Sequence, residues 1–205
     1  MLRRWTDRGM SKRIGIYSGT FNPVHLGHIS FALQALREAK LDLVYLMPER
    51  HRCNKQDVAH FGHRVAMIKR AILPHAKLSI IESPEISFNV NKTLPKLQAR
   101  FKHDQLVFLV GSDSLDSMAK WPQINNLLLG SELVVGIREG DESRILKLID
   151  QLPIQPKAKH IIDSYAPSVS SSKIRHALRN QVETEGILSS VRRYSNQNWL
   201  YISLA

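Results

Sequence analysis

The chain has 205 residues, a hydrophobic content of 43%, a formal net charge of +11 and one cysteine, Cys53. This length allows one domain with a substantial core, and a lone cysteine excludes an intramolecular disulfide, which fits the cytoplasm. No apolar run approaches the roughly 20 residues of a membrane-spanning helix, and the basic N-terminus lacks the apolar segment of a secretory signal. We therefore expect a cytoplasmic domain over residues 13–205, preceded by a basic, disordered leader over residues 1–12.

The positive charge predicts an anionic partner, either a nucleic acid or a ligand with several phosphates. The basic residues are spread over the whole chain, which has neither zinc-finger cysteine spacing nor a basic helix interleaved with aromatic residues. Charge alone is therefore weak evidence for nucleic-acid binding.

Short apolar runs alternate with segments of helical periodicity along the chain. The expected strands are residues 14–18, 41–47, 78–81, 106–110, 132–137 and 159–162. The expected helices are residues 29–39, 64–73, 91–102, 126–129, 143–152 and 171–179, followed by helical pieces over 182–200. This alternation predicts a single doubly wound, Rossmann-like α/β domain with a mostly parallel sheet and C-terminal helices.

One segment between the first strand and the first helix has the composition of a phosphate site. It reads Ser-Gly-Thr-Phe-Asn-Pro-Val-His-Leu-Gly-His over residues 18–28. Its glycines let the backbone approach an anion, and the helix end supplies free N–H groups and a positive dipole. His25 and His28 add donors for phosphoryl oxygens. A tight turn with two exposed histidines is the alternative, but the glycines, the strand and the helix together favour the phosphate site.

A second segment, Val-Ser-Ser-Ser-Lys-Ile-Arg over residues 169–175, leads into a late helix. Its hydroxyl groups make good helix caps, and Lys173 and Arg175 add charge that suits a polyphosphate. By itself such a cluster is more often a helix cap than a binding site. In a doubly wound sheet, ligands bind at the carboxyl ends of the strands, where residues 18–28, 48–55 and 111–113 all lie.

The two segments together resemble the nucleotidyltransferase superfamily with its H-x-G-H and S-S-T-x-I-R motifs. Within it the chain is most similar to the nicotinate-nucleotide adenylyltransferase family. The resemblance runs from about residue 13 to residue 203, and it includes residues 64–67, residues 111–115 with Trp121, and the C-terminal pattern ending at Tyr201.

This resemblance implies an enzyme of NAD biosynthesis that joins AMP from ATP to a pyridine mononucleotide and releases pyrophosphate. Nicotinate mononucleotide is the favoured acceptor. Such an enzyme positions its substrates and stabilises charge, without a covalent intermediate. Mg²⁺ would be bound by ATP oxygens and water, so no metal site made by the protein is expected.

The resemblance also assigns residues to roles. The implied catalytic residues are His25, His28, Lys55 and Arg175. The implied ATP-binding residues are Gly19, Thr20, Phe21, His25, His28, Ser170, Ser171, Ser172 and Arg175. The implied mononucleotide-binding residues are Lys55, Ser87, Asn89, Asp113 and Trp121. Trp121 would stack on the pyridine ring, and its place at a Trp-Pro helix start predicts that it is exposed. Asp113 would lie near the ribose.

The chain departs from the family pattern on the mononucleotide side. Residues 52–54 replace the Pro and His that usually precede Lys55, and residues 87–89 replace a Ser-Tyr-Thr stretch. Ser172 stands for the usual Thr and keeps the hydroxyl group. The Asn89 side chain can accept from an amide as well as donate to a carboxylate. An adenylyl- or cytidylyltransferase for another phosphorylated acceptor, such as nicotinamide mononucleotide, therefore stays an alternative.

Two functions of other classes compete with this interpretation. Residues 25–28 also resemble the H-I-G-H motif of class I aminoacyl-tRNA synthetases, so a nucleic-acid-binding protein with a basic surface is one alternative. The chain is short for that, and it lacks a K-M-S-K-S motif. A regulatory module that binds a dinucleotide without turnover is the other. The sequence leaves open whether the protein forms a homo-oligomer.

Overall fold

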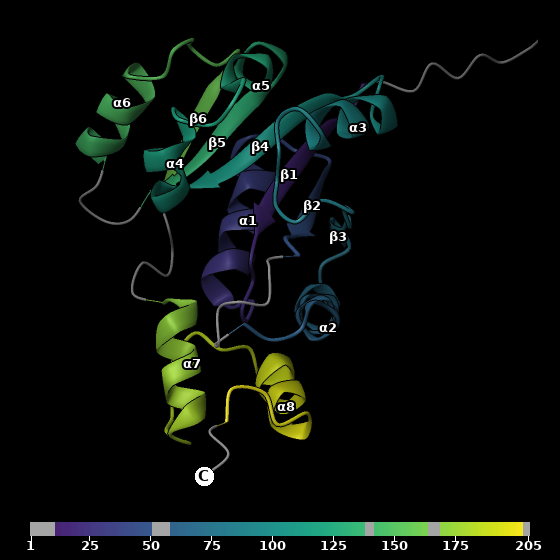
Figure 1. The fold of residues 1–205 in the computed structure, drawn as a ribbon, viewed down its shortest axis with the longest axis vertical. Coiled ribbons are helices and arrows are strands. Elements are labelled where there is room, and N and C mark those ends of the chain that lie inside the picture. Colours follow the sequence, from purple (N-terminus) through teal and green to yellow (C-terminus); the bar gives the residue numbers. More distant parts are fainter. Residues whose placement is uncertain (1–10, 51–57, 138–141, 164–168, 203–205) are drawn as a thin grey trace, which may run out of the picture.

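Parallel strands form the centre of the fold (Figure 1). The computed structural model describes residues 11–50, 58–137, 142–163 and 169–202. Within those residues there are six strands in one sheet of order β3-β2-β1-β4-β5-β6, and every neighbouring pair is parallel. The strands are β1 (Arg13–Gly19), β2 (Leu43–Pro48), β3 (Leu78–Ile80), β4 (Gln105–Gly111), β5 (Glu132–Ile137) and β6 (Lys159–Asp163).

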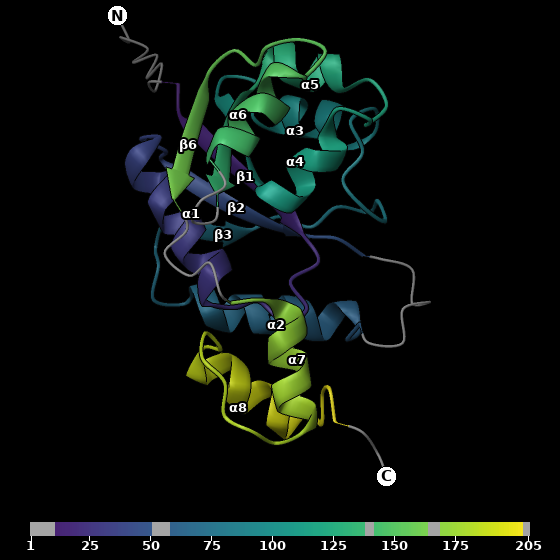
Figure 2. The same ribbon diagram turned by 90° about the vertical axis from the view of Figure 1, so that its left-hand side faces the viewer.

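Helices cover both faces of this sheet. They are α1 (Leu26–Glu38), α2 (Phe61–Ile72), α3 (Thr93–Arg100), α4 (Ser112–Met118), α5 (Ile124–Gly130), α6 (Glu142–Asp150), α7 (Ser171–Arg179) and α8 (Ser189–Gln197). Buried side chains of α1, α2 and α8 join one hydrophobic cluster, and those of α3 to α6 join another. Figures 1 and 2 show α7 and α8 at the end of the molecule away from α3 and α5.

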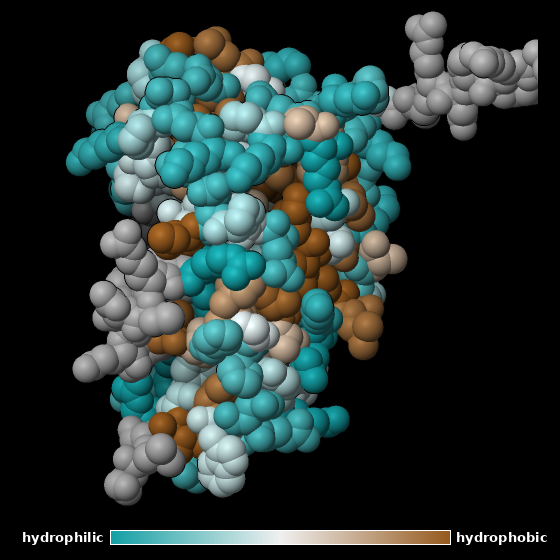
Figure 3. All heavy atoms as spheres, turned by 45° about the vertical axis from the view of Figure 1, so that its right-hand side comes forward, coloured by the Kyte–Doolittle hydropathy of each residue, from teal (hydrophilic) through white to brown (hydrophobic). Residues whose placement is uncertain are grey.

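The central strands are apolar on both sides because each side packs against a different cluster. In β4, Phe108 belongs to the cluster under α3 to α6, whereas its neighbours Val107 and Leu109 belong to the cluster under α1 and α2. Such strands read as continuous apolar runs, which is the pattern of a parallel sheet covered on both faces. The face in Figure 3 is largely hydrophilic, with hydrophobic side chains in its middle and along its right-hand edge.

The predicted fold class is confirmed, with corrections at particular elements. β5 and α7 have the predicted bounds, and Pro95 lies in the first turn of α3 as required. Helix α4 was not predicted, and α6 buries Ile145 and Ile149 while most of its other residues are exposed. The Trp121-Pro122 pair does not begin a helix, because α5 starts at Ile124.

The strand order places the binding edge of the sheet. Sequential order reverses between β1 and β4, and ligands bind outside the carboxyl ends of the strands at such a switch. Residues 18–28 span the end of β1 and the turn after it, and residues 111–113 span the end of β4 and the start of α4, so both segments lie at the same edge. In the part of the chain that the structure describes, no helix has both the length and the apolar character to cross a bilayer.

An ion pair links the start of β1 to the start of β5 at the opposite, amino-terminal edge of the sheet. The Arg13 guanidinium donates from Nη1 and Nη2 to Glu132 Oε1 and Oε2, at 2.9 and 2.6 Å. The Glu132 side chain is only 8% exposed, and the hydrogen bond from Arg13 is the chief cause of the lowered pKa of its carboxyl group. The unfolded chain therefore binds a proton at a higher pH than the folded protein does, so the stabilisation is complete above pH 4.5 and is lost as pH falls below it.

We expect Glu132→Gln to lower the free energy of unfolding at pH 7 by roughly 1–3 kcal/mol, because the pair is largely buried and bidentate. Urea denaturation at a series of pH values measures the loss, which should shrink below about pH 4 as the wild-type carboxylate is protonated. Glu183→Gln is the matched control, because Glu183 pairs with Arg192 in a position where its side chain is 92% exposed. A loss that stays equal from pH 7 to pH 3 would contradict an ionic origin.

Candidate active site

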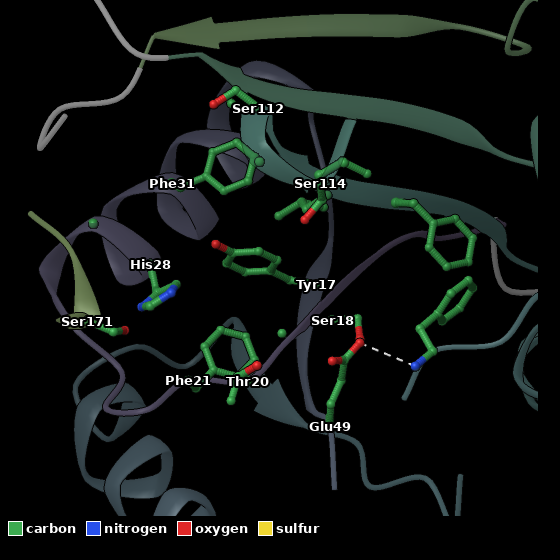
Figure 4. A pocket seen from close by; sticks show the side chains of 18 of the residues that line it. Tyr17, Ser18, Thr20, Phe21, His28, Phe31, Glu49, Ser112, Ser114 and Ser171 are labelled. Atoms are coloured by element: carbon green, nitrogen blue, oxygen red, sulfur yellow. Dashed lines mark hydrogen bonds between the residues drawn. The ribbon is translucent and has the colours of Figure 1, made fainter. Parts of the chain in front are cut away.

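A cavity of about 630 Å³ opens at the carboxyl edge of the sheet. It is lined by the ends of β1 and β4, the turn into α1, the start of α4, residues 87–88 and the residues that begin α7. A second cavity of about 320 Å³ shares Thr20, Phe21, His28 and Ser171 with the first and adds Arg175. The fold therefore brings both sequence motifs to one site (Figure 4).

The turn between β1 and α1 is anchored by its apolar residues. Phe21 and Val24 are buried in the cluster under α1, and Phe21 adopts a positive φ of 48°. A bulky residue takes this conformation only where the surroundings hold it. The ring of Phe21 meets that of Tyr17 edge to face at 5.3 Å between centroids. His25 then serves as the extended N-cap, and α1 begins at Leu26.

The two histidines lie against each other at the start of α1. Their ring centroids are 3.7 Å apart, and the backbone N–H of His25 donates to Nδ1 of His28 at 3.2 Å. This bond assigns the proton of neutral His28 to Nε2, which leaves Nε2–H as the donor for a ligand. Burial, and then the charge of His25, place the pKa of His28 well below its ordinary value. His28 is therefore a neutral hydrogen-bond donor near pH 7.

The second motif docks directly on this turn. Ser171 Oγ donates to the Pro23 carbonyl at 2.9 Å, and Arg175 Nη1 donates to the Asn22 carbonyl at 2.9 Å. Figure 4 shows Ser171 beside His28 at the left of the cavity. The N-terminus of α7 and the guanidinium of Arg175 thus meet the start of α1, and two helix N-termini with an arginine between them suit a polyphosphate.

Each serine of the second motif has a separate contact. Ser170 caps α7 by accepting the Lys173 N–H at 3.3 Å, as its position before the helix predicts. The Ser172 hydroxyl accepts from Arg175 Nη2 at 3.3 Å. Gly19 and Thr20 line the main cavity with all three serines, so each predicted ATP-side residue lies in one of the two cavities.

On the other side of the cavity, aromatic rings form a wall. Phe88 packs against Phe108 at 5.3 Å and against Trp121 at 5.9 Å between ring centroids. Ser87 and Trp121 both line the cavity, and Trp121 is partly exposed. This wall offers an apolar, stackable surface to a flat ring.

The remaining predicted residues have other placements. Asn89 is exposed and is not among the residues that line the cavity, and its Oδ1 accepts the backbone N–H groups of Asn91 and Lys92 at 2.9 and 3.0 Å. Asp113 belongs to the first turn of α4. Lys55, like residues 52–54, lies outside the described residues.

Two further residues of the site were not predicted from the sequence. Tyr17 lines the cavity with its ring fixed edge to face between Phe21 and Phe31, at 5.3 Å from each. Glu49 follows β2, and its Oε1 accepts from Ser18 Oγ at 3.1 Å and from the Phe88 N–H at 3.3 Å. The only sequence signal for either residue is its place at the carboxyl end of a strand.

The buried Arg64 side chain, only 1% exposed, holds the loops beside the site. Its Nε donates to the Ala59 carbonyl at 2.9 Å, and its Nη1 donates to the carbonyls of Thr20 and Glu49 at 2.7 and 2.8 Å. One guanidinium therefore joins the ends of β1 and β2 to the start of α2. The signal for its burial is helical spacing, since Arg64 lies on the same face as Met67, Ile68 and Ala71.

The chain is similar to known proteins over most of its length. The cytidylyltransferase-like family matches residues 16–177. A probable nicotinate-nucleotide adenylyltransferase of Clostridium perfringens is 32% identical over 197 residues, which cover 90% of this chain and 97% of that protein. The chain belongs to the nicotinate-nucleotide adenylyltransferase family. The nicotinate-nucleotide adenylyltransferase of Bacillus subtilis is 31% identical over 209 residues, covering 94% of this chain and 100% of that protein.

Solved structures agree in fold. The nicotinic acid mononucleotide adenylyltransferase of Plasmodium falciparum complexed with NaAD matches this structure with a TM-score of 0.76 at 21% identity. The match covers 95% of this chain and 100% of the Plasmodium chain. The same enzyme complexed with APC has a TM-score of 0.75 at 20% identity. Membership of the nicotinate-nucleotide adenylyltransferase family therefore rests on the sequence matches, and the parallel sheet is shared with enzymes of that name.

Proposed function

We propose that the protein transfers the adenylyl group of ATP to nicotinate mononucleotide and releases pyrophosphate, as a step in NAD biosynthesis in the cytoplasm. The observation that carries this proposal is the docking of α7 on the turn before α1. It brings Ser171 and Arg175 to His28 in a chain that matches named adenylyltransferases over nearly its whole length.

In this mechanism the phosphate oxygen of the mononucleotide attacks the α-phosphorus of ATP. The new P–O bond forms as the bond from the α-phosphorus to the bridging oxygen breaks, and pyrophosphate leaves with those electrons. His28 Nε2–H, held by the bond between its Nδ1 and His25, donates to phosphoryl oxygens whose charge grows in the transition state. Ser171 and Arg175 hold the β- and γ-phosphates beside the start of α7.

We propose Mg²⁺ as the metal of this reaction, brought to the site by ATP. Among the described residues, no group of three or more His, Cys, Asp or Glu side chains is placed to hold a metal ion. Mg²⁺ would be bound by phosphate oxygens of ATP and by water, and it would neutralise phosphate charge. We propose that Lys55 balances charge on the transferring phosphate, as the family pattern implies.

The acceptor would occupy the other side of the cavity. We propose that its pyridine ring stacks on Trp121 beside Phe88, that Ser87 contacts its substituent, and that Asp113 lies near its ribose. The case for nicotinamide mononucleotide rested on Asn89 as a hydrogen-bond acceptor. Two backbone N–H groups occupy that oxygen, so we favour the nicotinate form.

A pyrophosphate-release panel tests this function. The purified chain is assayed with Mg²⁺ and ATP against nicotinate mononucleotide, nicotinamide mononucleotide and phosphopantetheine, and then with CTP in place of ATP. We expect turnover with ATP and nicotinate mononucleotide, with kcat/KM at least roughly tenfold above every other pair. No release with that pair, together with steeply salt-dependent RNA binding, would favour the nucleic-acid alternative instead.

A further inference from the structure

The C-terminal segment reaches back to the phosphate turn through one side chain. The hydroxyl of Tyr201 donates to Asn22 Oδ1 at 2.7 Å, although the two residues are 179 positions apart. Asn22 is only 4% exposed, and the same Oδ1 accepts the Ala59 N–H at 3.0 Å. The Asn22 carbonyl accepts from Arg175. This one buried residue thus joins the turn to α7, to the approach to α2 and to the C-terminal segment.

The structure delivers the Tyr201 hydroxyl from a defined backbone. After α8 the chain turns through positive φ angles at Trp199 and Tyr201, and the Leu200 N–H donates to the Ser195 carbonyl at 3.0 Å. Ser195 is fully buried, and its hydroxyl donates to the Leu200 carbonyl at 3.3 Å. Helix α8 packs against α2 and lies near α7 in both ribbon views. These contacts hold the backbone that carries the Tyr201 hydroxyl.

The Tyr201 hydroxyl stays protonated, and so remains a hydrogen-bond donor, around neutral pH. Burial raises the pKa of its phenol, and the opposing effect of Arg175 and Arg64 is smaller. A protonated phenol donates to the amide oxygen of Asn22, so the bond does not depend on a titration near neutral pH.

We propose that Tyr201 is a positioning residue, whose hydroxyl acts through Asn22 to hold the turn that carries His25 and His28 in register with Arg175. The proposal rests on the proposed function in so far as it concerns catalysis. Donors aimed at developing phosphoryl charge accelerate a reaction only when they are already aligned, and a small misplacement is costly. Tyr201 is not among the residues that line either cavity, and its hydroxyl bonds the Asn22 side chain, so it would act on the turn and not on a substrate.

The chain contains a matched control for this bond. The Tyr194 hydroxyl, also in the C-terminal segment, bonds Nδ1 of His63 on α2 at 2.9 Å and makes no bond to the turn. Tyr201→Phe and Tyr194→Phe each remove one hydroxyl and leave the ring. If the C-terminal segment only needs to stay docked, the two variants should behave alike.

Hydrogen–deuterium exchange of the full-length chain without substrates tests the tether alone. We expect Tyr201→Phe to speed exchange of the backbone amides in residues 19–28, and Tyr194→Phe to leave them unchanged. Unchanged exchange in Tyr201→Phe, or equal acceleration in both variants, would overturn the proposal. This readout is independent of turnover, so it decides the tether even if the wild-type protein releases no pyrophosphate and the proposed function fails.

Steady-state kinetics tests the catalytic consequence. We expect Tyr201→Phe to lower kcat roughly five- to tenfold with KM for nicotinate mononucleotide unchanged, because the aromatic wall of Phe88 and Trp121 is untouched. In an Asn22→Ala background, Tyr201→Phe should have no further effect, because the hydroxyl then has no acceptor to act through. A raised KM with an unchanged kcat, or full additivity of the two substitutions, would overturn the proposal.

Discussion

His28→Ala should lower kcat for adenylyl transfer roughly 10²- to 10³-fold while the protein stays folded. His28 places a neutral Nε2–H at the meeting point of α1 and α7, and its orientation is set by the bond from the His25 N–H to its Nδ1. An alanine keeps the helix but removes the donor that meets the growing charge. Pyrophosphate release under saturating ATP and nicotinate mononucleotide measures the effect, with circular dichroism to confirm folding.

His103→Ala is the control for this substitution. His103 is exposed and precedes β4, so it lies at the amino-terminal edge of the sheet, away from the cavity. It should leave kcat unchanged. If His28→Ala retained wild-type turnover, the proposed role of the turn before α1 would be wrong, whichever acceptor the enzyme uses.

The same side chain has a signature in the pH dependence of stability. Burial depresses the pKa of His28 in the folded protein below its ordinary value of 6.5. The unfolded chain binds that proton first as pH falls, so stability declines from about pH 6.5 downward until the folded protein binds the proton too. His28→Ala removes this component, and its stability should therefore fall less steeply than that of the wild type between pH 6.5 and pH 5. Urea denaturation across this range measures the difference.

The parts of the site that are local in sequence could be predicted from it. The turn over residues 18–28 lies between a strand and a helix, and residues 170–175 begin a helix, so the glycines, hydroxyl groups and N-terminal positions are visible without the fold. Their docking, through Ser171 and Arg175 onto the carbonyls of the turn, is a contact across about 150 residues, and only the family resemblance pointed to it.

Other parts could not be predicted, for physical reasons that differ from residue to residue. Helix α4 follows β4 without a break, and its Gly-Ser-Asp-Ser start has the composition of a turn. The side-chain oxygen of Asn89 accepts two local backbone N–H groups, a common use of an asparagine before a helix that a motif comparison does not reveal. Glu49 acquires its partners from β1 and from residue 88, and neither contact leaves a periodic trace in the sequence.

The burial of Arg64 could be predicted from the sequence, but its hydrogen-bond partners could not. Among the substitutions considered, its replacement should lower the free energy of unfolding most. The helical face that it shares with Met67 and Ile68 predicts burial, whereas the three carbonyl groups that it joins come from separate segments. We expect Arg64→Leu to lower the free energy of unfolding by about 3 to 5 kcal/mol, because a buried acceptor that loses its donor costs roughly 1–3 kcal/mol. Chemical denaturation at pH 7 measures the loss, and the midpoint should fall at an unchanged m-value.

Two further variants test whether the loss of stability comes from the hydrogen bonds of the Arg64 guanidinium or only from the loss of a charged, long side chain. Arg64→Lys keeps the charge but cannot reach three carbonyl groups in a planar fork, so it should recover only part of the lost stability. Arg70→Leu changes an exposed arginine of the same helix, which bonds the Ala66 carbonyl within α2, and should cost less than about 1 kcal/mol. A loss for Arg64→Leu as small as that for Arg70→Leu would show that the turn after β1 holds its shape without this support. Because Arg64 fixes the carbonyl group of Thr20 itself, the folded fraction of Arg64→Leu should also turn over more slowly than the wild type.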